Sequence, residues 1–436
     1  MKQRFYSTRS ATEFVDVKEA VLRSLPADNG LYMPEHITPL PQSFWEGWRE
    51  RSFIDNSVAV AQQVFGESVP AEVMADLVAE VVAFEAPVVT VREKEHVLEL
   101  FHGPTLAFKD FGARFMARLM RYLTRDDEGL LTVLVATSGD TGGAVADAFH
   151  GVEGTQVIIL YPKGKVSLLQ EKQLTTLGGN VRALEVDGTF DDCQALVKGA
   201  FLDRELSKKL NLTSANSINI SRLVPQAFYY FEAAKQLPEG IEPVFVVPSG
   251  NFGNLTAGLL ARALGLPVKH FVAATNANDV VPSYLTSGRY EPRASVATIS
   301  NAMDVGAPSN FQRMEELFGK QWERMKDDIE GYAFSDEETR ATIKRIKAET
   351  GYTLEPHGAV GWLAAEKWRA SHPEDETIVL ETAHPAKFLD TMEEELGEGV
   401  VPIPERLAAL ADKKKVAVEI GTELESFKEW LRVDMM

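Results

Sequence analysis

From about residue 90 onward, short runs of apolar and β-branched residues alternate with segments that have helical periodicity. The runs are LTVLVA at 131–136, TQVIILY at 155–161, VRALEV at 181–186, PVFVVP at 243–248, VKHFVAA at 268–274 and TIVLE at 377–381. Apolar strands separated by helices are typical of parallel sheets that are buried on both faces. We therefore predict an α/β protein with a doubly wound, mostly parallel sheet.

The first ninety residues have a different pattern. The segments AVLRSL, SFWEGWRERSF and AEVMADLVAEVVAF have the spacing of amphipathic helices, and turns that contain proline separate them. We predict a helical N-terminal domain over residues 1–92, followed by the α/β region over residues 93–436. A chain of 436 residues is long enough for two or three domains.

Composition and charge disfavour several classes of function. The first residues lack the apolar run of a signal peptide, and no stretch approaches the roughly 20 apolar residues that span a bilayer, so we expect a cytoplasmic protein without a membrane partner. The single cysteine, Cys193, excludes an internal disulfide, and we expect no metal site. A formal net charge of −19 disfavours nucleic acid as a partner. A small anionic substrate needs only a local group of basic residues.

The turns that follow the predicted strands are the candidate binding sites, because ligands of open α/β sheets collect at the carboxyl ends of the strands. Residues 138–143 and 249–254 are glycine-rich turns before helices, and Thr382 and His384 follow the last strong strand. Neither glycine-rich turn has the spacing of a P-loop or of a dinucleotide fingerprint. The run SGNFGN at 249–254 is suited to a single phosphate group, although such a turn can also serve only to reverse the chain.

Lys109 lies between phenylalanines in the segment HGPTLAFKDFG. One interpretation is the start of an amphipathic helix with its lysine directed to solvent. The other is a partly desolvated amine, whose lowered pKa would make it nucleophilic toward an aldehyde. A Schiff-base lysine, a phosphate-binding loop and a third loop that contacts a ring together describe a site for pyridoxal 5'-phosphate.

Ten segments in order along the chain resemble the threonine synthases that carry a helical N-terminal extension, within the fold type II pyridoxal phosphate enzymes. They include FHGPTLAFKDFGARFMA, ATSGDTGGAVADAF, SANSINISRLVPQ, VPSGNFGNLTAGLLA, SNAMDVGAPSN and TAHPAKF. The resemblance implies a fold like that of the tryptophan synthase β subunit, with two open, mostly parallel sheets and helices on both faces. It also implies a smaller mobile domain over about 110–225, a larger cofactor-binding domain over about 226–400, and a C-terminal tail over 400–436 that packs on the body.

The resemblance assigns roles around the cofactor. Lys109 would form the Schiff base and later move protons. The cofactor phosphate would lie in the loop of Gly250, Asn251, Phe252, Gly253 and Asn254. Thr382 would be the hydroxyl partner of the pyridine nitrogen, and a neutral hydroxyl there would leave that nitrogen largely unprotonated.

The resemblance further implies O-phosphohomoserine as the substrate of a monomer or homodimer. The enzyme would eliminate the γ-phosphate and add water at the β-carbon, giving threonine and inorganic phosphate. The substrate carboxylate would bind at the turn of Ser138, Gly139, Asp140 and Thr141. Many related enzymes have asparagine where this chain has Asp140, and the role of this carboxylate stays open.

The substrate phosphate requires a second anion site. The candidates are Lys163, Ser214, Asn216, Asn219 and Arg222. Arg222 is the strongest candidate because a guanidinium can bind phosphate through two hydrogen bonds. Lys163 can equally belong to a solvated turn, and the polar run at 214–219 can equally cap a helix.

Three alternatives remain open at this point. The first is a fold type II enzyme of the threonine dehydratase or cysteine synthase type, although Ala107, Phe108 and Phe111 depart from the usual lysine setting of those enzymes. The second is a catalytically silent relative that binds phosphoesters, against which the intact Lys109 argues. The third is a plain nucleotide-binding module, which the missing P-loop disfavours. For His102, His357 and His384 we favour structural roles or leave the choice open.

Overall fold

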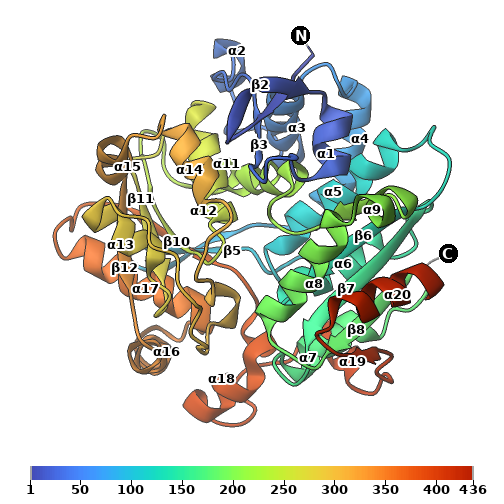
Figure 1. The fold of residues 1–436 in the computed structure, drawn as a ribbon. Coiled ribbons are helices and arrows are strands. Elements are labelled where there is room, and N and C mark those ends of the chain that lie inside the picture. The colour runs from blue at the N-terminus through green and yellow to red at the C-terminus, as the bar shows by residue number, and fades with distance from the viewer. Residues whose placement is uncertain (1, 435–436) are drawn as a thin grey trace.

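The computed structural model describes residues 2–434, in which three sheets are surrounded by helices (Figure 1). The largest sheet has the strand order β12-β11-β10-β13-β5-β4. Its strands are β4 (Val88–Arg92), β5 (Glu95–Glu99), β10 (Val244–Pro248), β11 (His270–Thr275), β12 (Ile329–Ala333) and β13 (Thr377–Glu381). All neighbouring pairs are parallel except β4 and β5, and Val246 lies opposite both Val272 and Val379.

The second sheet is parallel throughout and has the order β14-β8-β7-β6-β9. Its strands are β6 (Leu131–Ala136), β7 (Thr155–Pro162), β8 (Val181–Val186), β9 (Leu212–Ser214) and β14 (Val418–Ile420). The predicted α/β class with two open, mostly parallel sheets is confirmed. The edge strand β14 was not predicted, and it brings the C-terminal segment onto the second sheet, where α20 (Leu424–Asp434) lies against α8 (Phe190–Leu202).

The N-terminal region contains the expected helices together with a small antiparallel sheet. The helices are α1 (Val17–Arg23), α2 (Gln42–Trp45), α3 (Phe53–Phe65) and α4 (Ala71–Val81), and the strands are β1 (Phe5–Ser7), β2 (Ser10–Val15) and β3 (Tyr32–Pro34). The helical prediction did not include this sheet. Two of its strands have only three residues, which is too short for an alternating pattern to be read from the sequence.

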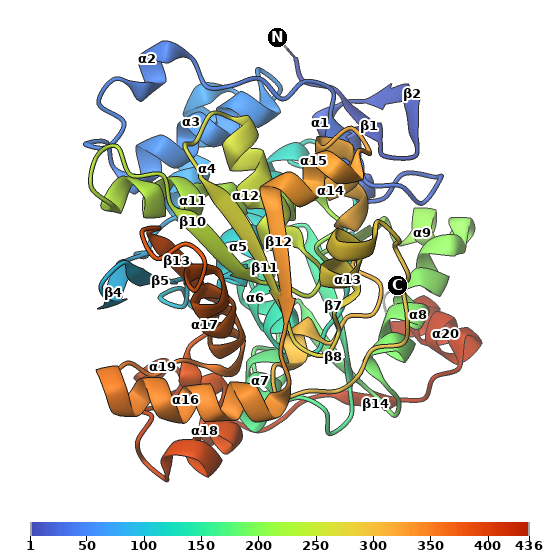
Figure 2. The ribbon, with the colours of Figure 1, turned by 90° about the vertical axis from the view of Figure 1, so that its left-hand side faces the viewer.

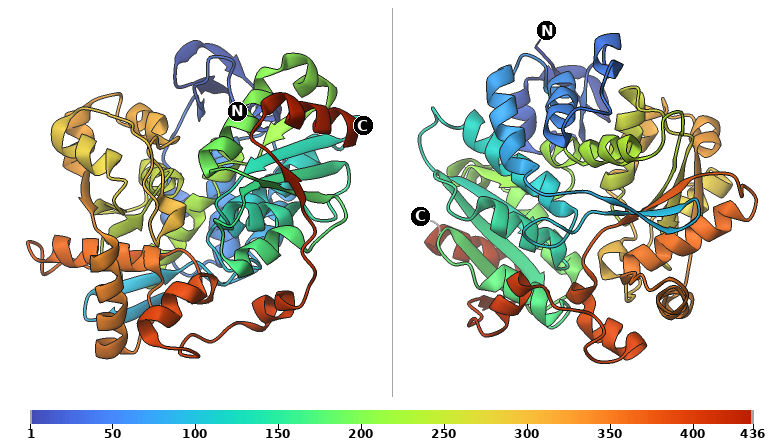
Figure 3. Two further views of the ribbon diagram at one scale, coloured as in Figure 1. Left: turned by 60° about the horizontal axis from the view of Figure 1, so that its bottom comes forward. Right: turned by 180° about the vertical axis from the view of Figure 1, so that it is seen from behind.

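Helices cover both faces of the two large sheets, as the views in Figures 2 and 3 show. The longer ones are α5 (Lys109–Leu123), α6 (Asp140–Phe149), α11 (Gln226–Gln236), α12 (Gly253–Ala263), α16 (Asp336–Thr350) and α17 (Pro356–Arg369). The others are α7 (Leu168–Thr175), α9 (Arg204–Lys209), α10 (Ile220–Leu223), α13 (Val280–Ser287), α14 (Phe311–Leu317), α15 (Trp322–Asp328), α18 (Leu389–Leu396) and α19 (Glu405–Ala411), with 3-10 turns η1 (Asn301–Met303) and η2 (Pro385–Phe388).

Helix α5 joins the parts of the molecule, because it contacts α4 of the N-terminal region, α6 beside the second sheet, and α10. Its inner face is apolar. Phe111 and Phe115 are fully buried and contact the rings of Tyr229 and Phe228 on α11, while Phe65 of α3 stacks on Phe115. Burial of a large aromatic side chain contributes about 2–3 kcal/mol. This packing holds the first residue of α5 in a defined position.

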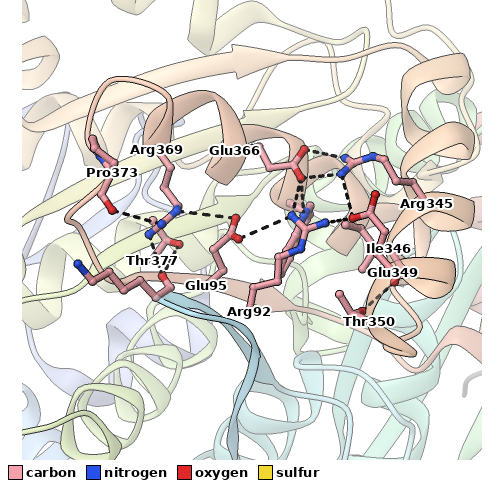
Figure 4. A network of polar contacts seen from close by, with 12 residues as sticks. Arg92, Glu95, Arg345, Ile346, Glu349, Thr350, Glu366, Arg369, Pro373 and Thr377 are labelled. Atoms are coloured by element: carbon pink, nitrogen blue, oxygen red, sulfur yellow. Dashed lines mark hydrogen bonds and ion pairs between the residues drawn. The ribbon is translucent and has the colours of Figure 1, made fainter.

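A network of ion pairs covers the outer side of the largest sheet at its β4 edge (Figure 4). Arg92 of β4 pairs with Glu366 of α17 at 3.1 Å and with Glu349 of α16, and Arg345 of α16 donates two hydrogen bonds of 2.8 and 2.7 Å to Glu366. Charged side chains on an edge strand oppose pairing with other chains. Among residues 2–434, no helix is long and apolar enough to cross a bilayer, and no cluster of metal-ligating side chains occurs.

Candidate active site

A cavity lies where the carboxyl ends of strands from both large sheets meet. It is bordered by the turns after β6, β10 and β13. Of the residues predicted from the sequence, the lining includes Lys109, Ser138, Asp140, Thr141, Asn216, Arg222, Gly250, Asn251, Phe252, Gly253, Asn254 and Thr382. The fold thus gathers five segments that are distant in the sequence, at 109, 138–141, 216–222, 250–254 and 382.

Lys109 is held by backbone pairing between two of these segments. The N–H of Phe108 donates to the carbonyl of Thr382 at 2.9 Å, and the N–H of His384 donates to the carbonyl of Leu106 at 3.0 Å. Lys109 is therefore adjacent to Thr382. Burial lowers the pKa of Lys109 to about 8; Asp140 opposes this shift, and Arg222 adds to it.

Asp110 shapes the turn before Lys109. Its buried carboxylate accepts hydrogen bonds from the N–H of Thr105 at 2.9 Å and from the hydroxyl of Thr105 at 2.6 Å. Burial raises the pKa of Asp110 to about 6, against these hydrogen bonds. Asp110 follows the lysine directly in HGPTLAFKDFG, but nothing in the sequence marked it as the anchor of the turn.

The loop after β10 leads into α12 and presents the N-terminus of that helix to the cavity. Phe252 has a left-handed backbone with φ of 59°, a strained conformation for a bulky residue that tends to occur at functional sites. A Cβ atom at Gly250 would lie 2.7 Å from the Ala302 carbonyl oxygen, so only glycine fits. The first N–H groups of a helix have no partner within the helix, which suits them to an anion. The Asn254 side chain is used within the loop, where it accepts from the Ser249 hydroxyl and donates to the Pro248 carbonyl.

Asp140 has a partner that the sequence analysis did not identify. The Nζ of Lys387 in η2 lies 2.7 Å from the Asp140 carboxylate, and Gln170 Nε2 donates to the same oxygen at 3.0 Å. Burial by itself raises the pKa of Asp140, but Lys387 and Lys109 outweigh it and hold this pKa well below its usual range. Asp140 is thus an ionised carboxylate whose charge Lys387 balances. The lysine of TAHPAKF, between apolar neighbours, was the only sequence signal for it.

Arg222 is a buried cation without a carboxylate partner. It is 3% exposed, and its NH1 donates to the Ala215 carbonyl at 2.5 Å. Within residues 2–434, its Nε has no hydrogen-bond partner and no carboxylate lies within ion-pair distance. Burial lowers the pKa of Arg222 to about 10, which Asp110 only partly opposes. A buried guanidinium that borders a cavity in this way is suited to an anionic ligand.

Four predicted residues do not line the cavity. Lys163 is at the surface, where its Nζ pairs with Glu419 of β14 at 2.7 Å, and it does not border the cavity. Gly139 is the N-cap of α6, with φ of 140°. The Gln170 side chain packs against Gly139, so a Cβ atom at position 139 would lie 2.6 Å from it.

Ser214 and Asn219 support the site from behind. Ser214 is buried in β9, and its hydroxyl lies 3.4 Å from the Asn216 side chain. Asn219 caps α10 by accepting from the Ser221 N–H at 2.9 Å, and its amide donates to Ser24 Oγ at 2.6 Å. Asn219 thus acts as a helix cap, and neither Ser214 nor Asn219 borders the cavity.

Two residues beside Thr382, His357 at the cavity and Glu355 behind it, were not assigned a binding role from the sequence. The Thr382 hydroxyl donates to Glu355 Oε1 at 3.1 Å, and Glu355 Oε2 lies 2.6 Å from His357 Nδ1. The N–H of Ala302 donates to His357 Nε2 at 3.2 Å. Thr382 and His357 both line the cavity, so one buried carboxylate orients two of its walls.

These features together fit pyridoxal 5'-phosphate. A half-buried amine with a lowered pKa suits the aldehyde, the glycine-containing N-terminus of α12 suits the phosphate, and Thr382 offers a polar contact for the ring. Among residues 2–434, no group of histidine, cysteine, aspartate and glutamate side chains is arranged to hold a metal ion.

Comparison with protein families agrees with this fit. The chain matches the family "Pyridoxal-phosphate dependent enzyme" over residues 91–381, "Threonine synthase N terminus" over 4–82 and "Threonine synthase, C-terminal" over 358–431. It is 47% identical to the threonine synthase of Escherichia coli (strain K12) over 94% of each chain. It is 36% identical to that of Saccharomyces cerevisiae over 95% of this chain and 94% of the yeast protein.

Solved structures give the same result. The crystal structure of threonine synthase from Escherichia coli has a TM-score of 0.93 and 44% identity, with 99% of this chain and all of the other covered. The structure of threonine synthase from Brucella melitensis with bound PLP has a TM-score of 0.90 and 36% identity, covering 99% of each chain. A PLP-dependent aspartate racemase, at 14% identity and a TM-score of 0.53, shares the fold alone. The chain therefore belongs to the threonine synthase family of pyridoxal phosphate-dependent enzymes.

Proposed function

We propose that this protein converts O-phospho-L-homoserine and water into L-threonine and inorganic phosphate. The observation that carries the proposal is the pairing, in one cavity, of a half-buried amine with a lowered pKa and a buried guanidinium that lacks a carboxylate partner. The first suits the cofactor aldehyde, and the second suits a substrate that brings its own phosphate. The names of the relatives support the same reaction.

The cofactor would be held by three parts of the chain. Lys109 would bind its aldehyde carbon, the loop at 250–254 and the N-terminus of α12 would bind its phosphate, and Thr382 would contact its ring nitrogen. When bound, pyridoxal phosphate withdraws electrons from the substrate carbons next to the amine.

Lys109 would be the group that moves protons. A pKa of about 8 leaves a useful fraction of the amine neutral near physiological pH, so that it can take the proton from the substrate α-carbon and later return one. Lys109 lies at the N-terminus of α5, where the packing of Phe111 and Phe115 keeps it in position.

The two anionic ends of the substrate would bind at separate places. Ser138 and Thr141, at the N-terminus of α6, would bind the carboxylate. Arg222, with Asn216 beside it, would bind the phosphate and stabilise the charge on this leaving group. Since Lys387 balances Asp140, the carboxylate in this wall does not repel an anionic substrate.

The lobe over about 110–225 would close on the larger lobe over about 226–400 and exclude water until the phosphate has left. We further propose a cytoplasmic protein that works as a monomer or homodimer.

A substrate panel tests the proposal. Purified holoenzyme is given O-phosphohomoserine, O-acetylserine or threonine, and release of phosphate, acetate or ammonia is measured together with the amino acid formed. We expect rapid phosphate release and threonine formation from the first substrate alone. Lys109→Ala should lose turnover and the absorbance of bound cofactor together. Rapid turnover of O-acetylserine or threonine with none of O-phosphohomoserine would instead indicate another activity of the same fold.

A further inference from the structure

Arg313 of α14 is a second buried arginine without a carboxylate partner. Among residues 2–434, Arg222 and Arg313 are the only buried arginines, and Arg313 is 0% exposed. Burial lowers the pKa of Arg313 to about 9, and no nearby charge opposes this shift. Arg313 is not part of the cavity lining, so the ligand of that cavity does not explain it. A buried cation without a counter-charge is costly, and its retention calls for a physical reason.

Neutral oxygens accept from every nitrogen of the Arg313 guanidinium. Nε and NH2 donate to the Tyr32 carbonyl at 3.2 and 3.1 Å, and NH2 also donates to the Ile218 carbonyl at 2.7 Å. NH1 donates to the Ser217 carbonyl at 3.3 Å and to the side-chain oxygen of Asn310 at 2.8 Å. A planar guanidinium directs its N–H groups along fixed lines, which an ammonium group does not. Arg313 therefore joins β3 of the N-terminal region, the loop between β9 and α10, and the start of its own helix.

The loop between β9 and α10, residues 215–219, belongs to the candidate site for the substrate phosphate. Asn216 and Ser217 border the cavity. The Ala215 carbonyl accepts from NH1 of Arg222 at 2.5 Å, so the position of the loop affects the position of that guanidinium. These five residues form neither a helix nor a strand. The loop therefore depends on contacts with other elements to keep its shape.

Arg313 sets the direction of two carbonyl groups in this loop. The carbonyl oxygens of Ser217 and Ile218 both point at the guanidinium, which lies outside the cavity lining. The C=O and N–H groups of a trans peptide point in opposite directions, so the N–H groups of the following residues point away from Arg313. A carbonyl oxygen carries partial negative charge and would repel a phosphate group. Its engagement by a buried cation reduces this repulsion.

Asn310, the residue before α14, supports the same loop. Its Nδ2 donates to the Ser217 carbonyl at 3.3 Å, and its backbone N–H donates to the Asn251 carbonyl at 3.1 Å. Asn310 is fully buried. The Ser217 carbonyl thus accepts from two side chains at the start of α14. Asn310 also contacts the loop to which we assign the cofactor phosphate, so the two anion sites share one support.

The N-terminal region holds the other end of the loop. Asn219 Nδ2 donates to the Val21 carbonyl at 2.8 Å and to Ser24 Oγ at 2.6 Å. The Tyr32 carbonyl, from the same region, accepts from Arg313. The loop is therefore held between the N-terminal region and α14, and Arg313 is the side chain that contacts both it and the N-terminal region.

We propose that Arg313 is a positioning residue for the substrate phosphate: its guanidinium holds the loop at 215–219, and through this loop Arg222, in the arrangement that binds the phosphate. The inference rests on the proposed function, because it assumes that the substrate phosphate lies at Arg222. Loss of the guanidinium should weaken phosphate binding and leave the cofactor bound at Lys109.

Binding of inorganic phosphate to the holoenzyme, measured by calorimetry, tests the inference without turnover. The cofactor occupies its own phosphate loop in the holoenzyme, so added phosphate reports on the substrate site. Arg313→Met should raise the Kd for phosphate by about 10-fold or more. Arg313→Lys keeps the charge but makes fewer hydrogen bonds, and it should raise this Kd by about 3–10-fold. The absorbance of the bound cofactor should stay that of the wild type in both variants.

Steady-state kinetics distinguish positioning from a general loss of stability. In Arg313→Met the KM for O-phosphohomoserine should rise with the Kd for phosphate, while kcat changes by less than about threefold. A protein that is only less stable has fewer active molecules, so its apparent kcat falls and its KM does not change. Met325→Ala is the matched control, because this side chain is buried in the neighbouring helix α15. It should lower the Tm and leave both KM and the Kd for phosphate unchanged.

A folded Arg313→Met protein whose Kd for phosphate is within about twofold of the wild-type value would overturn the inference, as would a fall in kcat with an unchanged KM. If Arg313→Met does not fold, Arg313→Lys decides the question by the same two measurements. Failure of the proposed function is distinguishable: a wild-type holoenzyme that releases no phosphate from O-phosphohomoserine would refute both. An effect of Arg222→Met on phosphate binding, with none of Arg313→Met, would refute this inference alone.

Discussion

The ion-pair network at the β4 edge and the cavity between the sheets both contain several charged side chains, but these are paired in the network and partly unpaired at the cavity. In the network, each guanidinium has carboxylate partners: Arg92 pairs with Glu366 and Glu349, and Arg345 pairs with Glu366 (Figure 4). These side chains keep about a third of their surface exposed. In the cavity, Arg222 is buried without a carboxylate, and the pKa of Lys109 is lowered by burial.

The difference distinguishes charges that stabilise the structure from charges that are suited to bind a ligand. A partly exposed pair costs little desolvation and contributes little stability. A buried cation without a partner destabilises the folded protein. Its presence therefore indicates a binding site, in which an anionic ligand would supply the missing partner. The Asp140–Lys387 pair lies between these cases, since it is buried but balanced.

The largest effect should come from breaking the balanced pair. Lys387→Met leaves the Asp140 carboxylate buried without its ammonium partner and should lower the free energy of unfolding by about 3–5 kcal/mol. Urea denaturation measures it. Asp140→Asn combined with Lys387→Met removes both charges and should recover most of this loss. If the single variant is as stable as the wild type, Asp140 is not held as an ion pair.

Removal of the unpaired cation should harm binding rather than folding. Arg222→Met should raise the KM for O-phosphohomoserine by about 10–100-fold, because a charged hydrogen-bonding partner of the phosphate contributes about 1.5–3 kcal/mol. Stability should be unchanged or higher, since a buried uncompensated charge is lost. Titration of the cofactor provides the control, and an equal loss of cofactor affinity would argue against a substrate-phosphate role for Arg222.

The pH dependence of stability should reveal the lowered pKa of Lys109. The amine has a pKa near 10.5 when unfolded and about 8 when folded. Between these values the unfolded chain binds the proton and the folded protein does not, so stability contributed by this group rises with pH over that window. Relative to Lys109→Met, the cofactor-free wild type should gain about 1–3 kcal/mol from pH 8 to 10.5. A constant difference between the two proteins across this window would show that burial does not shift the amine.

The smallest effect should come from the network. Arg345→Met removes a partner of Glu366 at the surface and should lower the free energy of unfolding by less than about 1 kcal/mol, with turnover unchanged. The loss should shrink further in high salt, because screening already weakens exposed pairs. Denaturation at two salt concentrations measures it. A loss as large as that of Lys387→Met would remove the distinction between the two regions.

Much of the fold could be predicted because its signals are local. The predicted strands at 131–136, 181–186 and 377–381 coincide with β6, β8 and β13. Continuous apolar runs must be buried on both faces, which leaves few arrangements other than a parallel sheet covered by helices. The small N-terminal sheet and the strands β4, β5, β9, β12 and β14 were not predicted; β1, β3, β9 and β14 have only three residues each, too few to show a periodicity.

Some residues of the site could be identified from the sequence, and others could not. The glycine-rich turns and Lys109 could be found from the sequence, because a helix N-terminus and an amine among aromatic residues have local patterns. From the sequence, Lys163 was a candidate anion ligand. In the fold, Glu419 of β14 pairs with it instead. No local pattern indicated that Lys387 pairs with Asp140 or that Glu355 contacts Thr382.

The sequence by itself determined the α/β class, six strands of the two large sheets, the turns that line the cavity and the lysine that borders it. Each of these follows from periodicity, backbone freedom or residue type within a short window. Only the tertiary structure decided which buried charges are balanced and that the Thr382 hydroxyl lies beside Glu355. The reason is that burial makes the partner of a charge decisive for its energy, and that partner is chosen by how distant strands and helices are brought together.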